Sequence, residues 1–190
     1  RYAREQKHLD ELAALLGLKE PPKIIESYDI SNWGDGTSVA GMVVFEDGKP
    51  KKAGYRRFKM NTVAGTDDYA SMAETLARRA AEYEKGAKGQ FGIKPDLLLI
   101  DGGRGQVSAV QAALAGTQLA DVPMFGMVKD DKHRTRGLVS AAGGEIMLAM
   151  HRGVFTFVTS IQDETHRWAN DYRRRMQKSR AYSSTLQSVP

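Results

Sequence analysis

The stretch PDLLLIDGGRGQ, residues 95–106, places four apolar residues, Leu97 to Ile100, directly before an acid, Asp101, and a glycine-rich turn. A short apolar run bounded by Pro and Gly predicts a buried strand, and residues 105–116 after it predict a helix. In open α/β sheets, ligands bind just outside the carboxyl ends of the strands. Asp101 is therefore a candidate ligand-binding residue, and the glycines that follow let another backbone or a phosphate approach closely.

Asp101 also has other interpretations at this point. Asp before Gly-Gly is common in turns and at helix N-caps, so a purely structural role is one alternative. A phosphate-binding loop is a weaker one, because DGGRGQ lacks the spacing of either familiar glycine fingerprint. A carboxylate also repels phosphate unless a cation lies between them. That repulsion favours a metal ion at the end of the strand.

The residues before this stretch predict three strands. Residues 24–30 are short and β-branched at their start, and residues 39–60 predict two strands around a hairpin at Asp47-Gly48. We expect the three strands to form an antiparallel meander. An N-terminal helix and a stiff Pro-containing connector are predicted over residues 1–22.

Helices and strands alternate after the meander. Residues 66–86 predict a helix whose N-cap is Asp67 or Asp68. The strand of the opening stretch, its helix and a strand at residues 122–128 follow, and such a series favours a parallel arrangement. After a charged loop and a small hairpin, apolar residues from 154 to 172 recur every three or four positions and predict one long helix.

This order predicts an α/β fold with a mixed sheet, in which three antiparallel strands precede parallel ones and helices cover both faces. The ribonuclease H-like fold has this succession, whereas a doubly wound nucleotide-binding fold alternates strand and helix from the start. We expect the domain to span residues 23–182.

Composition narrows the class of protein. With 190 residues, 41% hydrophobic and 27% charged, the chain can bury a core and is not disordered. The absence of cysteine excludes disulfides, thiol catalysis and Cys-ligated zinc. No apolar run approaches the ~20 residues that span a bilayer, so no membrane association is expected. Residues 151–190 hold seven Lys/Arg against three acids, which favours either a polyanionic partner or a solvated helix end.

Asp29 is a second unusual acid, because it lies inside the predicted first strand. By alternation it shares a face with Ile25 and Ser27. An unpaired buried charge is costly, so Asp29 either faces solvent or is retained for function. If the first and fourth strands are neighbours, Asp29 and Asp101 converge on one hard divalent cation.

The last helix supplies a third candidate, His166, beside the predicted apolar stripe. A lone histidine on a helix is more often a surface residue, but imidazole can also ligate metal or carry protons. Asp68 is either a helix cap or a further carboxylate at the same cleft. Basic residues of the charged loop and the last helix suit phosphate contacts; they are Lys129, Lys132, Arg134, Arg136, Arg173 and Arg174.

Five motifs in succession resemble the C-terminal half of the UvrC family, the incising subunit of the bacterial nucleotide excision repair excinuclease. They are IESYDISNWGDGTSVAGMVVFEDGKPKKAGYRRFKM, GTDDYASM, PDLLLIDGGRGQ, VKDDKHRTRGL and IQDETHRWA. The resemblance runs from about Lys23 to the end. It implies that residues 183–190 lead into a helix-hairpin-helix module, and that this module, the GIY-YIG nuclease domain and the UvrB-binding segment lie outside the chain.

The resemblance implies a ribonuclease H-like endonuclease that cuts the damaged strand of double-stranded DNA on the 5′ side of the lesion. The family's Asp-Asp-His set falls on Asp29, Asp101 and His166, and its additional acid falls on Asp68. It further implies Mg²⁺ or Mn²⁺ as cofactor, UvrB as partner and a cytoplasmic location.

Two positions depart from the family pattern, and two other functions are compatible with the residues. Gln162 and Arg173 stand where some relatives carry Arg and His, which affects DNA contacts rather than the chemistry. The first rival is a non-catalytic DNA-binding module whose acids are structural. The second is a nucleotide-binding α/β enzyme that uses the glycine loop.

Overall fold

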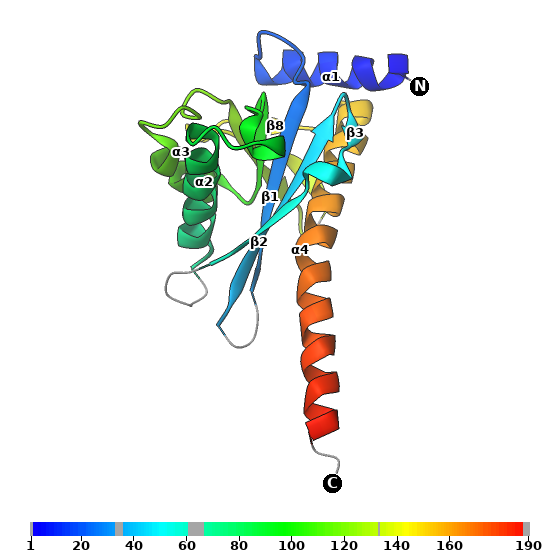
Figure 1. Cartoon of the computed structure of the whole chain (residues 1–190). Helices are drawn as coiled ribbons and strands as arrows, with labels where there is room; N and C mark the ends of the chain where they lie inside the picture. Colours follow the sequence, from blue (N-terminus) through cyan, green and yellow to red (C-terminus); the bar gives the residue numbers. More distant parts are fainter. Residues whose placement is uncertain (1, 33–35, 61–66, 133, 188–190) are drawn as a thin grey trace.

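The computed structural model describes residues 2–32, 36–60, 67–132 and 134–187. Within them the chain forms one eight-stranded sheet flanked by helices (Figure 1). The strands are β1 (Ile24–Asn32), β2 (Ser38–Glu46), β3 (Lys49–Pro50), β4 (Arg56–Lys59), β5 (Leu97–Asp101), β6 (Met124–Lys129), β7 (Thr135–Val139) and β8 (Glu145–Met147). The helices are α1 (Tyr2–Leu16), α2 (Asp68–Glu84), α3 (Arg104–Leu114) and α4 (Arg152–Gln187), with 3₁₀ turns η1 (Lys52–Gly54) and η2 (Gly89–Gly92).

The sheet is mixed, as the sequence predicted. Its order is β3-β2-β1-β5-β6-β7-β8, and β4 also pairs with β2. β1 and β2 are antiparallel, whereas β1, β5 and β6 run parallel to one another, and β7 and β8 continue antiparallel. The predicted neighbours, the first strand and the strand of residues 95–101, therefore do lie side by side.

Helices cover both faces of the sheet, which also confirms the prediction. On one face α2 and α3 bury Met72, Leu76 and Val110 against the sheet. On the other face α1 and α4 contribute to a second core that contains Leu12 and Val158. Alternation along β1 divides the strand between them: its even-numbered residues face the first core and its odd-numbered ones the second.

The long helix α4 is the element that reaches furthest from the sheet. Its N-terminal half packs on β1, β2 and α1, and its C-terminal half extends beyond the body of the molecule (Figure 1). Among the described residues, no helix combines the length and the apolar character needed to cross a lipid bilayer.

The hairpin after β2 was predicted in the right place, but its returning strand was wrong. Asp47 and Gly48 both have positive φ angles, 53° and 82°, as a two-residue hairpin turn requires. The return was predicted as one strand, whereas the structure divides it into β3 and β4 around the 3₁₀ turn η1. Regular pairing with β2 ends at Pro50, although the Lys51 backbone N–H still donates to the Val44 carbonyl, and it resumes where Arg56 pairs with Met42.

A buried ion pair fixes β1 against α2. Both side chains of Glu26 and Arg79 are fully buried, with Arg79 Nη2 2.8 Å from Glu26 Oε2 and Arg79 Nε 3.0 Å from Glu26 Oε1. The Tyr28 hydroxyl donates to the same carboxylate at 2.6 Å. Arg79 also donates to the carbonyls of Phe91 and Ile93. One guanidinium therefore connects the central strand to α2 and to the segment before β5.

We expect Arg79→Met to lower the free energy of unfolding by about 3–5 kcal/mol, because it leaves the Glu26 carboxylate buried without its counter-ion. Urea denaturation followed by circular dichroism measures this loss. Replacing both partners with methionine should restore much of it, since no buried charge then remains. Lys85→Met, which breaks an exposed ion pair with Glu82, is the control and should change stability little. A loss below about 1 kcal/mol for Arg79→Met would contradict this account.

Candidate metal centre

The parallel pairing of β1 and β5 places two acids side by side. Tyr28 pairs with Ile100, so the next residues of the two strands, Asp29 and Asp101, occupy adjacent positions at the carboxyl end of the sheet. Neighbouring strands lie about 4.8 Å apart, and side chains at matching positions point to the same face. The face is the one that α4 covers, as the alternation of Ile25, Ser27 and Asp29 indicates.

α4 brings a histidine to these acids. His166 Nδ1 lies 3.1 Å from Asp29 Oδ2. One residue earlier, the Thr165 hydroxyl lies 2.9 Å from the Ser27 hydroxyl, so helix and strand are in direct contact here. Gly41, the residue of β2 that pairs with Asp29, permits this approach, because a Cβ there would lie 3.0 Å from the Trp168 ring and 3.1 Å from the Ala169 side chain.

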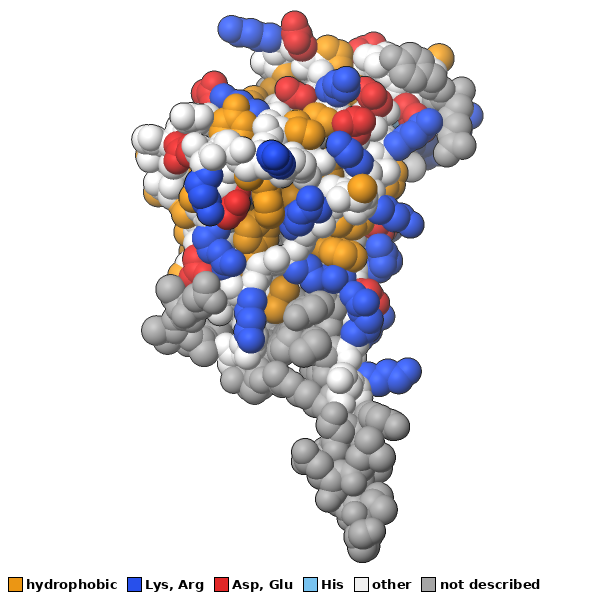
Figure 2. Space-filling view, viewed as in Figure 1, with side chains coloured by type: hydrophobic (Ala, Val, Ile, Leu, Met, Phe, Trp, Pro, Cys, Tyr) orange, Lys and Arg blue, Asp and Glu red, His pale blue; other side chains and the backbone are white. Residues whose placement is uncertain are grey.

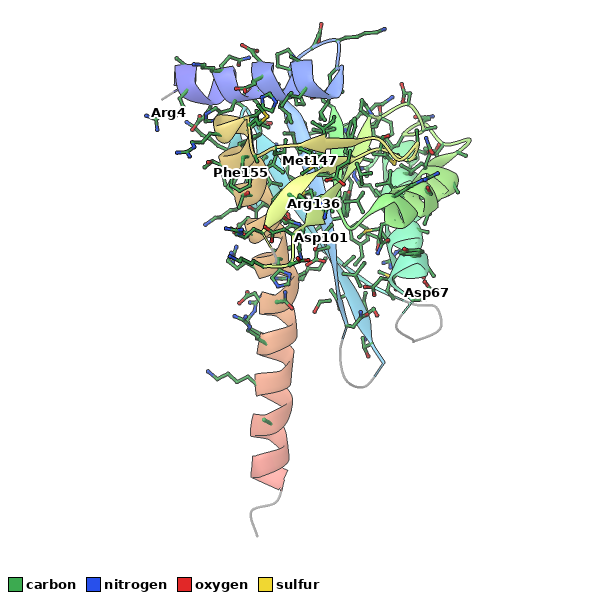
Figure 3. The ribbon with its side chains drawn as sticks, turned by 180° about the vertical axis from the view of Figure 1, so that it is seen from behind. Arg4, Asp67, Asp101, Arg136, Met147 and Phe155 are labelled. Atoms are coloured by element: carbon green, nitrogen blue, oxygen red, sulfur yellow. The ribbon has the colours of Figure 1, made fainter. Side chains whose placement is uncertain are left out.

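Asp29, Asp101 and His166 together form a group with the composition of a metal site. Each offers a ligand atom, and these atoms all lie within 4.8 Å of one another. Carboxylate oxygens with an imidazole nitrogen suit Mg²⁺ or Mn²⁺. Figure 3 shows Asp101 beside α4, in the view from behind. The side chains present therefore fit a divalent ion.

The electrostatics of the site favour a bound cation. Asp29 is buried, and its burial together with the neighbouring Asp101 raises its pKa to about 6, although the hydrogen bond with His166 acts in the opposite direction. The same hydrogen bond raises the pKa of His166. The ionised form of Asp29 is therefore disfavoured unless a positive charge compensates it.

The protein's own polar side chains surround Asp101. Lys129 Nζ lies 3.3 Å from Asp101 Oδ2, and Gln162 Nε2 donates to Asp101 Oδ1 at 2.9 Å. The Thr135 hydroxyl in turn donates to Gln162 Oε1. Sequence analysis had associated Gln162 and Lys129 only with DNA. The available signal was helical spacing, since Gln162 precedes His166 by four residues and lies on the same side of α4.

The glycines after Asp101 permit three close approaches. Gly102 has φ 152°, and a Cβ there would lie 2.5 Å from the Gln106 side chain. A Cβ on Gly105 would lie 2.4 Å from the Tyr69 hydroxyl, so the first turn of α2 packs directly on the start of α3. On β6, a Cβ on Gly126 would meet the Gly102 carbonyl. Glycines in the turn and on β6 thus let α2, α3 and β6 pack closely around the segment that follows Asp101.

Asp68 lies at the edge of this site rather than inside it. Asp67 is the N-cap of α2 and accepts the Ala70 backbone N–H, which decides between the two predicted caps. Asp68 Oδ1 accepts a hydrogen bond from Asn32 at 2.8 Å. Together with Asp101, it lines an open hollow of about 420 Å³. Asp68 is not among the three residues whose ligand atoms gather within 4.8 Å.

The basic residues that were predicted to contact DNA differ in whether they already form ion pairs. Lys132 is exposed, Arg134 forms an ion pair with Asp130, and Arg136 forms a bidentate pair with Glu145. Arg174 is exposed on the extended part of α4, where the side chain of Arg173 lies outside the described residues.

A further basic surface lies beyond β2 from the metal centre, since Arg57 pairs with Gly41, which in turn pairs with Asp29. Figure 2 shows Lys and Arg side chains gathered over the face that carries β2, β3 and α4. In this region Arg56, Arg57 and Lys59 line a shallow pocket together with Tyr55 and Trp168.

Comparison with known proteins identifies the family. Residues 13–169 match the family model described as the UvrC RNAse H endonuclease domain. The chain belongs to this family. The match confirms the predicted ribonuclease H-like fold and the resemblance drawn from the five motifs.

The similar curated proteins are much longer than this chain. It is 45% identical to the UvrABC system protein C of Alkaliphilus oremlandii and 42% identical to that of Clostridium acetobutylicum, covering 96% of this chain and 31% of each relative. The chain thus spans about a third of the length of these relatives.

Solved structures give weaker similarities. Human ENDOV is 16% identical, with a TM-score of 0.43 over 76% of this chain and 71% of that protein. A Ciona intestinalis endonuclease V bound to DNA is 14% identical, with a TM-score of 0.43 over 67% of this chain and 55% of that one.

We expect Asp29→Asn to stabilise the metal-free protein at pH 7.5. A pKa raised from 3.8 to about 6 means that the folded state binds the proton more tightly than the unfolded state. Ionisation of Asp29 therefore lowers stability as pH rises through this interval, by about 1–3 kcal/mol. Asparagine removes that cost.

Urea denaturation in EDTA tests this expectation. The stability of the variant should exceed that of the wild type at pH 7.5. The difference should shrink as pH falls and vanish well below pH 3.8, where Asp29 is protonated in both states. Added Mn²⁺ should stabilise the wild type and not the variant. A variant that is less stable than the wild type in EDTA at pH 7.5 would contradict the raised pKa.

Proposed function

We propose that this chain is the metal-dependent endonuclease part of a UvrC protein, which makes the 5′ incision beside a lesion in nucleotide excision repair. The observation that carries the proposal is the meeting of Asp29, Asp101 and His166, whose ligand atoms lie within 4.8 Å at the carboxyl ends of parallel strands. Family membership supports the same reaction class, and the names of the relatives support a place in the UvrABC system.

Asp29, Asp101 and His166 are the residues that would hold Mg²⁺ or Mn²⁺. Such an ion polarises a phosphate and lowers the pKa of a bound water when it is present. Asp29 and Asp101 bind through carboxylate oxygens on rigid strands, so the position of the site is fixed by the sheet. Because Asp29 is buried, few other groups can contact its carboxylate, which stays directed toward Asp101 and His166.

His166 and Asp68 are assigned supporting roles. His166 directs Nδ1 toward Asp29, and its side chain is 61% exposed. Its Nε2 is therefore accessible to exchange a proton with water or with a leaving oxygen, or the ring completes the coordination. Asp68 lies with Asp101 along the adjacent hollow, where it can orient water near the reacting phosphate.

Basic residues would hold the DNA backbone without reading its bases. Lys129 already supplies a positive charge at Asp101 and is positioned to contact a phosphate once a metal ion neutralises that acid. The other proposed contacts lie on the charged loop and on α4; they are Lys132, Arg134, Arg136, Arg173 and Arg174. The substrate is damaged double-stranded DNA. We further propose UvrB as a partner of the longer protein, and a cytoplasmic location.

Calorimetric titration with Mn²⁺ at pH 7.5 tests the proposed centre. We expect the wild type to bind and Asp101→Asn to lose binding at least tenfold, because one of the two carboxylates is gone. Asp163→Asn is a matched control: it removes an exposed acid from the same helix, one turn before His166 and outside the cluster. Circular dichroism verifies that both variants remain folded.

Cleavage of labelled duplex DNA on the same variants connects binding with activity. Mn²⁺-dependent cleavage that Asp101→Asn loses and Asp163→Asn keeps is the expected result. Equal Mn²⁺ binding by all three proteins would contradict the proposal and favour a non-catalytic DNA-binding module. Thermal stabilisation by ATP, together with no Mn²⁺ binding, would instead favour the nucleotide-binding alternative.

A further inference from the structure

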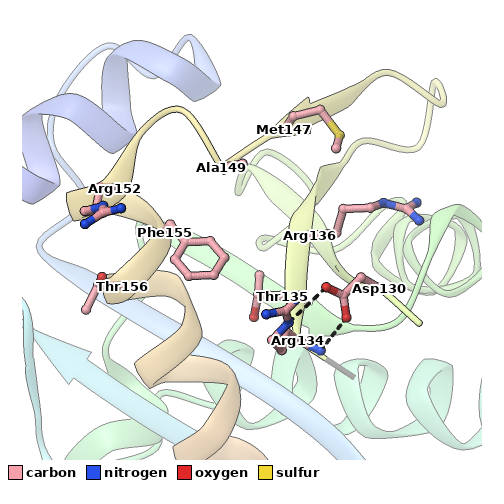
Figure 4. A pocket seen from close by; sticks show the side chains of 9 residues that line it. All are labelled: Asp130, Arg134, Thr135, Arg136, Met147, Ala149, Arg152, Phe155 and Thr156. Atoms are coloured by element: carbon pink, nitrogen blue, oxygen red, sulfur yellow. Dashed lines mark hydrogen bonds and ion pairs between the residues drawn. The ribbon is translucent and has the colours of Figure 1, made fainter. Parts of the chain in front are cut away.

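A pocket separate from the metal centre lies between β7, β8 and the first turns of α4. Its volume is about 470 Å³. Figure 4 shows the Phe155 ring between α4 and β7, with Met147 and Ala149 on the far side. Phe155 is only half-buried, and Met147 is 51% exposed. The pocket thus presents an aromatic ring and other apolar groups to solvent.

Positive charge surrounds this apolar floor. Arg134, Arg136 and Arg152 line the pocket, against one acid, Asp130. The Asp130 carboxylate already accepts the backbone N–H groups of Lys132 and Arg134 and pairs with the Arg134 guanidinium, as the dashed lines of Figure 4 show in part. Arg152 forms no hydrogen bond or ion pair with any residue that the structure describes. Its guanidinium is therefore free for an anionic ligand.

The pocket lies one hydrogen-bonded side chain, Gln162, away from the metal centre. Its wall residue Thr135 donates to Gln162, which donates to Asp101, so two successive hydrogen bonds connect the two sites. Phe155 and His166 lie eleven residues apart on the side of α4 that also carries Gln162. Eleven residues correspond to about 16 Å along the helix. A stacked DNA strand covers that distance in about five nucleotides.

We propose that this pocket binds an unpaired nucleotide of the DNA strand that occupies the metal centre, with the base against Phe155 and a phosphate against Arg152. The proposal rests on the proposed nuclease function and adds a second contact to it. An aromatic ring beside an unpaired guanidinium, that of Arg152, is the combination that recognises single-stranded nucleic acid, because every base has a flat face and every phosphate a charge. The lining carries a net positive charge, so it favours a DNA strand over an apolar peptide that has no acidic residues.

Two hexanucleotides with equal charge test the proposal. One is hexathymidylate, and the other carries the same phosphates on abasic sugars. Each is titrated into the full chain in the presence of Ca²⁺, which replaces Mg²⁺ or Mn²⁺ so that the strand is not cut. NMR spectra of ¹³C-methyl methionine follow the Met147 methyl group, identified by its loss in Met147→Leu. We expect hexathymidylate to shift this signal and to bind about tenfold more tightly than the abasic strand.

Variants separate the base contact from the charge. Phe155→Leu keeps an apolar side chain in the core but removes the ring, so it should abolish the difference between the two strands. Arg152→Gln should weaken both strands several-fold, whereas Lys88→Gln, the removal of one exposed charge at η2, should have a smaller effect. Neither pocket variant should change Mn²⁺ affinity, because neither residue belongs to the metal-ligand cluster.

Three outcomes would overturn the proposal. The first is equal affinity of the wild type for both strands. The second is DNA binding and Mn²⁺-dependent cleavage without movement of the Met147 signal, which leaves the nuclease function intact and rejects only the pocket. The third is a Met147 signal that responds to an acidic, Phe-containing peptide but not to DNA, which would assign the pocket to a protein partner.

Discussion

The fixed adjacency of Asp29 and Asp101 is the constraint on which the site depends. The register of two parallel strands fixes these carboxylates at neighbouring positions, so neither can move away without disrupting the sheet. Burial of Asp29, with a smaller effect of the neighbouring Asp101 carboxylate, raises the pKa of Asp29 to about 6. Polar side chains contact both acids: His166 contacts Asp29, and Lys129 and Gln162 contact Asp101. A divalent ion would neutralise both acids at once and remove the cost of ionising the buried Asp29.

The position of α4 determines whether the histidine reaches this pair. Trp168 anchors the helix to the sheet: its indole Nε1 donates to the Arg56 carbonyl at 2.9 Å, and the Arg57 guanidinium lies 3.3 Å from the centre of its ring. Tyr55 adds a 2.7 Å hydrogen bond to Glu164. Because these contacts lie within one turn of His166, they fix its distance from Asp29. Residues of the short strand β4 therefore hold the proposed metal ligand His166 in place without belonging to the ligand cluster themselves.

The sequence predicted the framework well, because periodicity and turn chemistry depend on local residues. Asp101 at the end of an apolar strand and Asp29 inside another were identifiable as costly acids, and the strand order that joins them followed from the succession of elements. The break between β3 and β4 was missed because the sequence of the returning segment does not show that the 3₁₀ turn η1 interrupts its pairing with β2. The Glu26–Arg79 pair was missed for a different reason: its residues are 53 positions apart, and charge pattern does not reveal which distant cation fills a core. The contact of Gln162 with Asp101 was missed because it depends on how α4 is docked.

Anomalous diffraction from crystals of this chain grown with Mn²⁺ tests the central claim most directly. Our account predicts a peak within coordination distance of one oxygen of Asp29 and one of Asp101, with Lys129 displaced from its contact with Asp101. A structure without a peak at this position, in which Lys129 still pairs with Asp101 in the presence of saturating Mn²⁺, would contradict it. The two acids would then be a structural feature of the sheet rather than a metal centre.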